Sequence, residues 1–148
     1  MRIISHRGNI QGSNSKVENT ISQIDKCINF GYDVEIDIRK IDNNFYLGHD
    51  NPNHYVSLNW LKERISNLWI HCKNLKSLLY FLDTNIDFNF FWHQSDDYVI
   101  TSKKIIWTYP GKTFTSKSVI VMPENNFNLI DFYKLKEYNV YGICTDYP

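Results

Sequence analysis

The chain has 148 residues, of which 43% are hydrophobic and 16% aromatic, and its formal net charge is zero. This size and composition are typical of one folded domain with a substantial core, here residues 1–148, and they exclude a disordered chain. The neutral charge gives no basis for general attraction to nucleic acid or to an anionic membrane, and no apolar run approaches the roughly 20 residues of a membrane span.

The N-terminus and the cysteines indicate the compartment. The first residues, MRIISHRGN, are too polar for a signal peptide. The three cysteines, Cys27, Cys72 and Cys144, are widely spaced and odd in number, which favours reduced, buried thiols over a disulfide framework. We therefore expect a cytoplasmic protein.

The predicted elements alternate between strand and helix over the first two thirds of the chain. A buried strand at residues 2–5 stops at His6-Arg7-Gly8, and a polar loop leads to a helix at residues 18–30 that Gly31 caps. The next elements are a strand at 33–39 that pairs with a short one at 45–47, a helix capped by Ser57, a strand at 68–73, a helix at 75–82 and a strand at 88–93. This order is typical of parallel β/α units.

The last third of the chain departs from this order. Strands are predicted at residues 105–108 and 119–122, but the connections around the first of these are too short and polar for full helices. A last helix at about 129–138 leads to a final strand at 141–145. The total is about seven core strands and four helices.

The strand at residues 33–39 carries the first sign of a site. Side chains alternate along a strand with period two, so Glu35 and Asp37 project from the same face, opposite Val34, Ile36 and Ile38. Two carboxylates this close repel each other unless a cation lies between them or one holds a proton. Taken alone they could be solvated strand residues, but the following hairpin returns a histidine, His49, towards them.

Further polar residues gather at one edge of the predicted sheet. In parallel β/α folds, ligands bind at the carboxyl ends of the strands. The residues at or near these ends are His6, Glu35, Asp37, His71, Lys73, His93, Trp107, Glu124 and Asp146. Their concentration predicts an active site there without naming its reaction.

The motifs, taken in order, resemble those of the glycerophosphodiester phosphodiesterase family, within the phospholipase C-like phosphodiesterases. The match is dense over residues 1–50 and returns at the C-terminus. It consists of His6-Arg7-Gly8, Glu18-Asn19-Thr20, Gly31-Tyr32-Asp33, Glu35-Ile36-Asp37, Gly48-His49-Asp50 and the closing Gly142-Ile143-Cys144-Thr145-Asp146-Tyr147-Pro148. These motifs in this order form a specific signal, whereas each alone is weak.

The resemblance implies a fold and a reaction. The fold is an α/β, TIM-type (β/α) barrel; because a full barrel takes about 250 residues, we expect a small, trimmed one with about seven or eight parallel strands and an incomplete outer ring of helices. The reaction is metal-dependent hydrolysis of a glycerophosphodiester-type substrate. His6 and His49 would be acid and base in an unassigned order, and Arg7 would contact the phosphate.

The resemblance also implies the ligands of a divalent ion, with Mg²⁺ or Ca²⁺ expected. Glu35 and Asp37 match the family's metal pair, and Glu18 and Asn19 match a pair lining the metal and phosphate site. Lys73 matches the lysine of the family's E-x-K strand. His71 stands where that strand has its acid, and a nitrogen ligand shifts preference towards Mn²⁺ or Zn²⁺. Glu124 could supply the missing carboxylate, and His93 and Trp107 are candidate substrate contacts.

Three alternative functions stay open at this stage. One is a lyase that forms a cyclic phosphate, as in the related sphingomyelinase D type, and another is a metal- and phosphate-binding module without turnover. The third, a tailoring enzyme for phosphodiester-linked surface polysaccharide, has no support from particular residues. Missing helices would expose apolar surface near Ile105 and Val119, and such surface usually finds a partner, so we expect a homo-oligomer.

Overall fold

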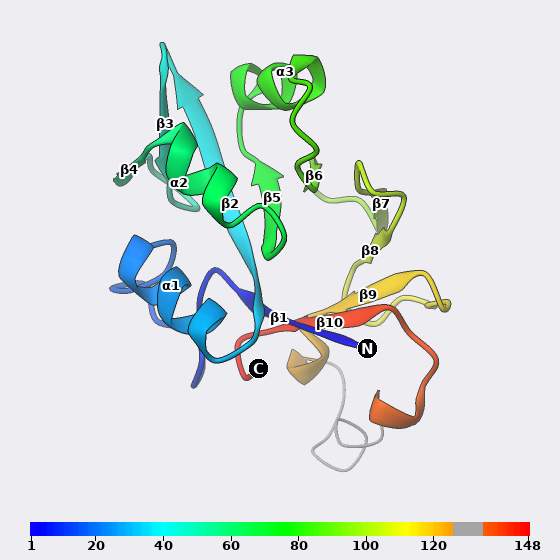
Figure 1. The fold of residues 1–148 in the computed structure, drawn as a ribbon. Helices are drawn as coiled ribbons and strands as arrows, with labels where there is room; N and C mark the ends of the chain where they lie inside the picture. Colours follow the sequence, from blue (N-terminus) through cyan, green and yellow to red (C-terminus); the bar gives the residue numbers. More distant parts are fainter. Residues whose placement is uncertain (126–134) are drawn as a thin grey trace.

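A single mixed sheet that curves into an open half-barrel organises the protein (Figure 1). The computed structural model describes residues 1–125 and 135–148, and this part of the chain contains ten strands. Seven of them form parallel ladders in the order β6–β5–β2–β1–β10–β9–β8. Their bounds are β1 (Arg2–His6), β2 (Asp33–Ile41), β5 (Leu68–Cys72), β6 (Phe90–Phe91), β8 (Ile106–Thr108), β9 (Ser118–Val121) and β10 (Gly142–Thr145).

Three antiparallel strands extend this parallel arrangement. The far end of β2 forms a hairpin with β3 (Asn44–Leu47), to which β4 (His54–Val56) adds. At the other margin, β7 (Tyr98–Ile100) pairs with β8. Neither β4 nor β7 was predicted, because three-residue strands leave almost no periodic signal in a sequence.

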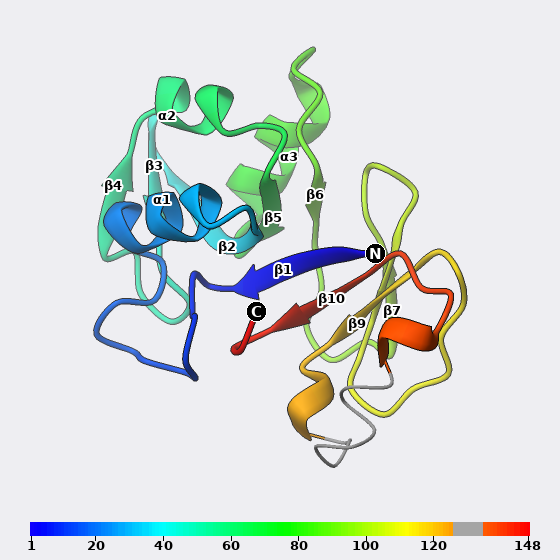
Figure 2. The ribbon, with the colours of Figure 1, turned by 60° about the horizontal axis from the view of Figure 1, so that its bottom comes forward.

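The helices of the described residues cover one half of the sheet only. They are α1 (Ile21–Asn29), α2 (Leu58–Glu63) and α3 (Leu75–Asp83), with 3₁₀ turns at η1 (Pro123–Asn125) and η2 (Leu135–Glu137). In Figures 1 and 2 all three helices lie on the outer side of β2, β3 and β5. Their apolar faces pack against the outward residues of β2 and β5, so Val34, Ile36 and Ile38 are fully buried.

The first helix begins later than the sequence predicts. Thr20 is its N-cap, with Oγ1 accepting a hydrogen bond from the backbone of Gln23, so the helix starts at Ile21 and not at Glu18. An N-cap residue keeps extended backbone angles, which frees the residues before it from the helical spiral. Glu18 and Asn19 consequently belong to a loop that bends back towards β2.

The prediction of a trimmed TIM-type barrel is wrong. The described residues include only three helices and no ladder between β6 and β8, so the sheet stays open between them. A further parallel strand needs a crossover of at least about 10–12 residues, usually a helix. The segment between β6 and β8 instead forms β7, which folds back antiparallel onto β8. The predicted helix at 129–138 falls largely outside the described residues; its end is the η2 turn.

The inner face of the half-barrel has an apolar floor. Trp107 on β8 lies 4.7 Å from Phe91 and 5.8 Å from Trp69, measured between ring centroids. Ile4, Val119 and Cys144 complete this cluster from β1, β9 and β10. Residues one step further along β1, β2 and β5 lie above the floor, at the carboxyl ends of the strands. The polar side chains at these strand ends therefore lie next to a buried cluster that is rich in aromatic rings.

The expectation of bare apolar surface near Ile105 and Val119 is wrong at these two residues, because Val119 is 0% exposed and Ile105 packs partly buried against its cluster. Ile120, on the outer face of β9, is 3% exposed because Leu135 and Val140 cover it. Ile100 on the edge strand β7 is 71% exposed. The homo-oligomer stays a prediction. Among the described residues, no helix has the length and hydrophobicity needed to cross a bilayer.

The cysteines yield a test of the packing. All three are buried and free. Burial raises the pKa of Cys72 to about 12 and also raises the pKa of Cys27 and Cys144. Because the thiolate is the reactive form, we expect the native protein at neutral pH to react with Ellman's reagent far more slowly than free cysteine, and three equivalents to react after denaturation. Rapid labelling of the native protein would contradict this packing.

Candidate active site

Three potential metal ligands meet at the centre of the inner face. Glu35 and Asp37 project from β2 and are 3% and 0% exposed, and His71 projects from the adjacent β5, where it is paired in register with Asp37. One ligand atom from each of these three residues lies within 4.8 Å of the others. This buried group could hold a metal ion.

The surroundings of His71 leave one nitrogen available for such an ion. Its Nε2 lies 3.3 Å from the backbone oxygen of His93 and donates to it, since a carbonyl only accepts. Its Nδ1 faces the acids, 3.0 Å from Oδ1 of Asp37 and 3.7 Å from Oε1 of Glu35. The His93 ring stacks on His71 with centroids 4.5 Å apart and fixes the ring plane. A carbonyl that holds the distal nitrogen is the usual support of a metal-binding histidine.

The charge balance of the acids also fits a cation. Burial and the charge of Asp37 raise the pKa of Glu35. Burial alone would raise the pKa of Asp37 as well, but nearby His71, Arg7 and Lys73 hold it far below its ordinary value. Oδ1 of Asp37 is buried and receives no hydrogen bond. A divalent ion would satisfy this oxygen; an imidazolium at His71 is the alternative partner.

Asn19 holds Asp37 in place from the loop before α1. Its Nδ2 donates to Oδ2 of Asp37 over 3.0 Å, and its Oδ1 accepts from the Asp37 backbone over 2.9 Å. Asn19 has φ = +56° and is 1% exposed. A buried residue in this sparsely populated conformation must be held by its surroundings, here by the two bonds to Asp37. Asn19 therefore positions a carboxylate and does not line the cavity.

Arg7 stands between the carboxylates and the cavity. Its backbone N–H donates to Oε2 of Glu35 over 3.1 Å, which requires the left-handed conformation at φ = +54°. Its guanidinium lies 3.2 Å from Asp37 and 3.4 Å from Glu18. Burial would lower the pKa of Arg7, but Asp37 and Glu35 raise it, so the group stays charged.

His6 is oriented by the C-terminal segment. Its Nδ1 donates to Oδ1 of Asp146 over 2.8 Å, and Nδ2 of Asn9 donates to the same oxygen over 2.7 Å. Burial alone would lower the pKa of His6, but the bond to Asp146 and the charge of Glu35 outweigh it and raise the pKa. With Nδ1 occupied, Nε2 is the nitrogen left for a ligand.

His49 reaches the site from the loop after β3. Gly48 has φ = +141°, and a Cβ there would overlap the carbonyl oxygen of Asn51, so only glycine fits. The Arg39 guanidinium donates to the carbonyls of Gly48 and His49 and pins the turn. Nδ1 of His49 donates to Asp50 over 2.6 Å. Burial and the cations Arg7 and Lys73 lower the pKa of His49.

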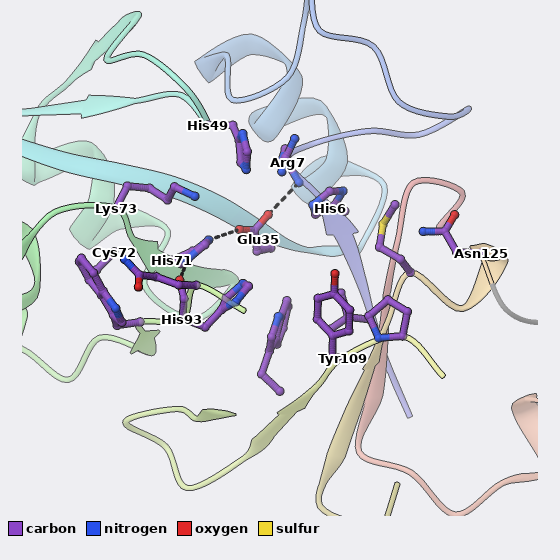
Figure 3. Close-up of a pocket in the computed structure, with 16 residues that line it drawn as sticks. His6, Arg7, Glu35, His49, His71, Cys72, Lys73, His93, Tyr109 and Asn125 are labelled. Carbon is purple, nitrogen blue, oxygen red and sulfur yellow. Dashed lines mark hydrogen bonds and ion pairs between the residues drawn. The ribbon is translucent and has the colours of Figure 1, made fainter. Parts of the chain in front are cut away.

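These side chains surround one cavity of about 400 Å³ (Figure 3). The β1, β2 and β5 side forms an ionic wall, with His6, Arg7, Glu35, His49, His71 and Lys73. We call the other lining residues that carry rings or amides the aromatic wall: Trp92, His93, Gln94, Trp107, Tyr109 and Asn125. A ligand in this cavity would meet both the cations and imidazoles and the aromatic rings.

Most of the sequence-predicted residues line this cavity; Asp37 belongs to the ligand group without lining the cavity, and three others lie away from it. Glu18 pairs with Arg7 and accepts from Asn9 and Ser13. Glu124 accepts from the Thr145 hydroxyl and from the Asp146 backbone, which fastens the last turn of the chain. Asn19 contacts Asp37, as above. Neither Glu18 nor Glu124 belongs to the group of three potential ligands.

Sequence reasoning missed roles for Asn9, Asp146 and Tyr109. Asp146 carried a signal, because it follows the last strand within the closing motif, yet its pairing with His6 spans almost the whole chain. Asn9 lies in a polar loop that gives no sign of its burial at 1% exposure. Tyr109 directly follows the strand predicted at residues 105–108, so the sequence already placed it at a carboxyl end without giving it a role.

Comparisons of the chain with protein-family models, with curated proteins and with solved structures find no match. The functional argument therefore depends on the residues themselves.

Metal binding is the first test of the site. We expect Mn²⁺ or Zn²⁺ to raise the melting temperature at lower concentrations than Ca²⁺ does, because His71 offers nitrogen. An ion at 100 times its Kd stabilises the folded state by about 2.7 kcal/mol. The variant Glu35→Gln should lose this shift; it keeps the shape of a protonated Glu35, so the fold should tolerate it. Calorimetric titration and thermal unfolding measure both effects.

Two further variants make this test specific. His71→Glu supplies a third carboxylate and should move the preference towards Mg²⁺ and Ca²⁺. Glu63→Gln is the matched control, because Glu63 is an exposed acid of α2 that pairs only with Arg64 among the described residues. Equal metal affinity in the wild type and in Glu35→Gln would place the ion elsewhere.

Proposed function

We propose that the protein cleaves phosphodiesters with a divalent ion held by Glu35, Asp37 and His71. The observation that carries the proposal is one cavity that is lined by two oriented histidines, by two cations and by Glu35 and His71 of the buried metal-ligand group, with Asp37 beside them. The reaction agrees with the one that the family resemblance implies. The proposal does not depend on a closed barrel, because every contributing side chain belongs to the open half-barrel that the structure describes.

The ionic wall suits an anionic diester. A phosphodiester is a stable anion, so its charge must be neutralised before a nucleophile can attack. When bound, a divalent ion would polarise a phosphoryl oxygen and neutralise charge at the phosphate. Arg7 and Lys73 add positive charge beside it, and Arg7 keeps hydrogen-bond donors beyond those directed at Asp37 and Glu18.

The two histidines differ in a way that assigns their roles. His49 has a lowered pKa and is neutral near pH 7, so it suits the base. His6 has a raised pKa and a carboxylate on Nδ1, so it suits the acid. Asp146 acts on the reaction through His6 by stabilising the imidazolium form, which makes it a positioning residue.

In the proposed reaction, a hydroxyl, from water or from the substrate itself, loses its proton to His49 and forms a new P–O bond. The P–O bond to the leaving alcohol breaks, and His6 donates its proton to the departing alkoxide. Water as the nucleophile gives a phosphomonoester, whereas a neighbouring substrate hydroxyl gives a cyclic phosphodiester.

The direct test is turnover of bis(p-nitrophenyl) phosphate and of glycerophosphodiesters with Mg²⁺, Ca²⁺ or Mn²⁺. We expect metal-dependent activity that both His49→Ala and Glu35→Gln reduce by about 10²- to 10⁴-fold, the range of general acid–base and metal effects. Phosphorus NMR of the product separates hydrolysis from cyclic-phosphate formation. Metal and phosphate binding without any turnover would favour the binding module.

Leaving-group dependence tests the assignment of the histidines. p-Nitrophenolate leaves without protonation, whereas an alkoxide needs an acid. His6→Ala should therefore lose about 10²- to 10⁴-fold in kcat/KM on an alkyl diester and much less on a p-nitrophenyl diester. His49→Ala should lose activity on both substrates to the same extent. If the two variants behave in the reverse manner, the roles are exchanged.

The pH profile offers an independent test. Activity requires neutral His49 and protonated His6. Because the pKa of His49 lies below the ordinary 6.5 and that of His6 above it, kcat/KM on an alkyl diester should rise with pH through a value below about 6.5 and fall through a value above it. A profile that lacks the alkaline limb would contradict the role of His6. With a p-nitrophenyl diester this limb should flatten.

A further inference from the structure

The aromatic wall of the cavity has no role in cleaving a P–O bond. Tyr109 follows β8 and is 48% exposed, although it lines the cavity. Figure 3 shows it across from Arg7 and His49, with its hydroxyl directed towards the ionic wall. Trp92, on the segment after β6, lines the same side and is partly buried. An aromatic ring that is half exposed in a cavity offers a flat apolar face to a ligand.

Two amide side chains accompany these rings. Gln94 and Asn125 are exposed to solvent and line the cavity next to Trp92 and Tyr109. Each amide offers donors and an acceptor, which suits hydroxyl groups. No carboxylate, lysine or arginine lines this side among the described residues, so the wall selects a neutral group that is apolar on one face and rich in hydroxyls at its edge.

We infer that the substrate is a phosphodiester of a sugar, with a pyranose-type ring lying against Tyr109 while the phosphate meets the ionic wall. This inference rests on the proposed function and names its substrate class. The axial C–H groups of a pyranose form an apolar face that packs on an aromatic ring, and its hydroxyls would reach Gln94 and Asn125.

Other substrates fit the cavity less well. A glycerol group has no face that could cover a ring. The volume of the cavity, about 400 Å³, is near the low end of the roughly 300–1,000 Å³ of small-molecule pockets. This volume suits a phosphate with one ring and not the acyl chains of a lipid.

Binding of product-like phosphomonoesters tests this inference without requiring turnover. The probes are glucose 6-phosphate, glycerol 3-phosphate and adenosine monophosphate, titrated with Mn²⁺ present. We expect glucose 6-phosphate to bind roughly tenfold more tightly than glycerol 3-phosphate. Tyr109→Leu should bring the ratio of the two affinities close to one, whereas Tyr109→Phe, which retains the ring, should preserve the ratio.

The control variant is Tyr98→Leu. Tyr98 is a similarly exposed tyrosine, 49% against 48%, on the neighbouring strand β7, and it does not line the cavity. This variant should keep the wild-type ratio. Loss of the ratio in Tyr98→Leu would mean that the effect comes from the β7–β8 hairpin as a whole and would overturn the role of Tyr109.

The other outcomes separate this inference from the proposed function. If both monoesters bind equally and Arg7→Ala weakens both, the sugar subsite is refuted while the phosphate site stands. Tightest binding of adenosine monophosphate would refute the sugar and identify a nucleoside. If none of the three probes binds, the proposed function fails together with the inference.

Discussion

The burial of two like charges on one strand constrains the rest of this structure. Glu35 and Asp37 lie side by side on the inner face of β2 with almost no exposure to water. Burial of unpaired carboxylates is costly, so their surroundings must supply positive charge and hydrogen bonds. Arg7 and Lys73 provide the charge, and Asn19 and the Arg7 backbone provide the bonds. The loop after β1 and the end of β5 are held in place by this requirement.

Compensation of the acids also explains the strain near the site. Arg7 and Asn19 both have positive φ, which is uncommon outside glycine, and in this conformation the Arg7 backbone donates to Glu35 and the Asn19 side chain donates to Asp37. The bonds they make offset the conformational cost. Next to the acids, His6 donates a hydrogen bond to Asp146, and Asn9 donates to the same carboxylate oxygen. These bonds connect the C-terminal segment to the site.

The open half-barrel shapes the cavity as much as the chemistry does. One half of the sheet has helices behind it and carries the ionic wall, whereas the rings and amides come mainly from residues that follow β6, β8 and β9. Because no strand of the described residues closes the gap between β6 and β8, the aromatic wall is formed by short strands and the residues that follow them, such as Tyr109. This division separates the groups suited to a reacting phosphate from those suited to the alcohol it carries.

The sequence alone determined the two acids on one strand face, the histidine that follows them in the hairpin, and the buried strands and amphipathic helices of the first two thirds. These are local, periodic properties that neighbouring residues encode. Tertiary structure decided the rest. The partners of His6 and Asp37 come from distant segments. The orientation of the His71 ring depends on the backbone carbonyl of His93, which follows β6. Closure of the sheet depends on whether the segment after β6 crosses over or folds back onto β8. Such outcomes depend on contacts between segments far apart in the chain, and periodicity does not carry them.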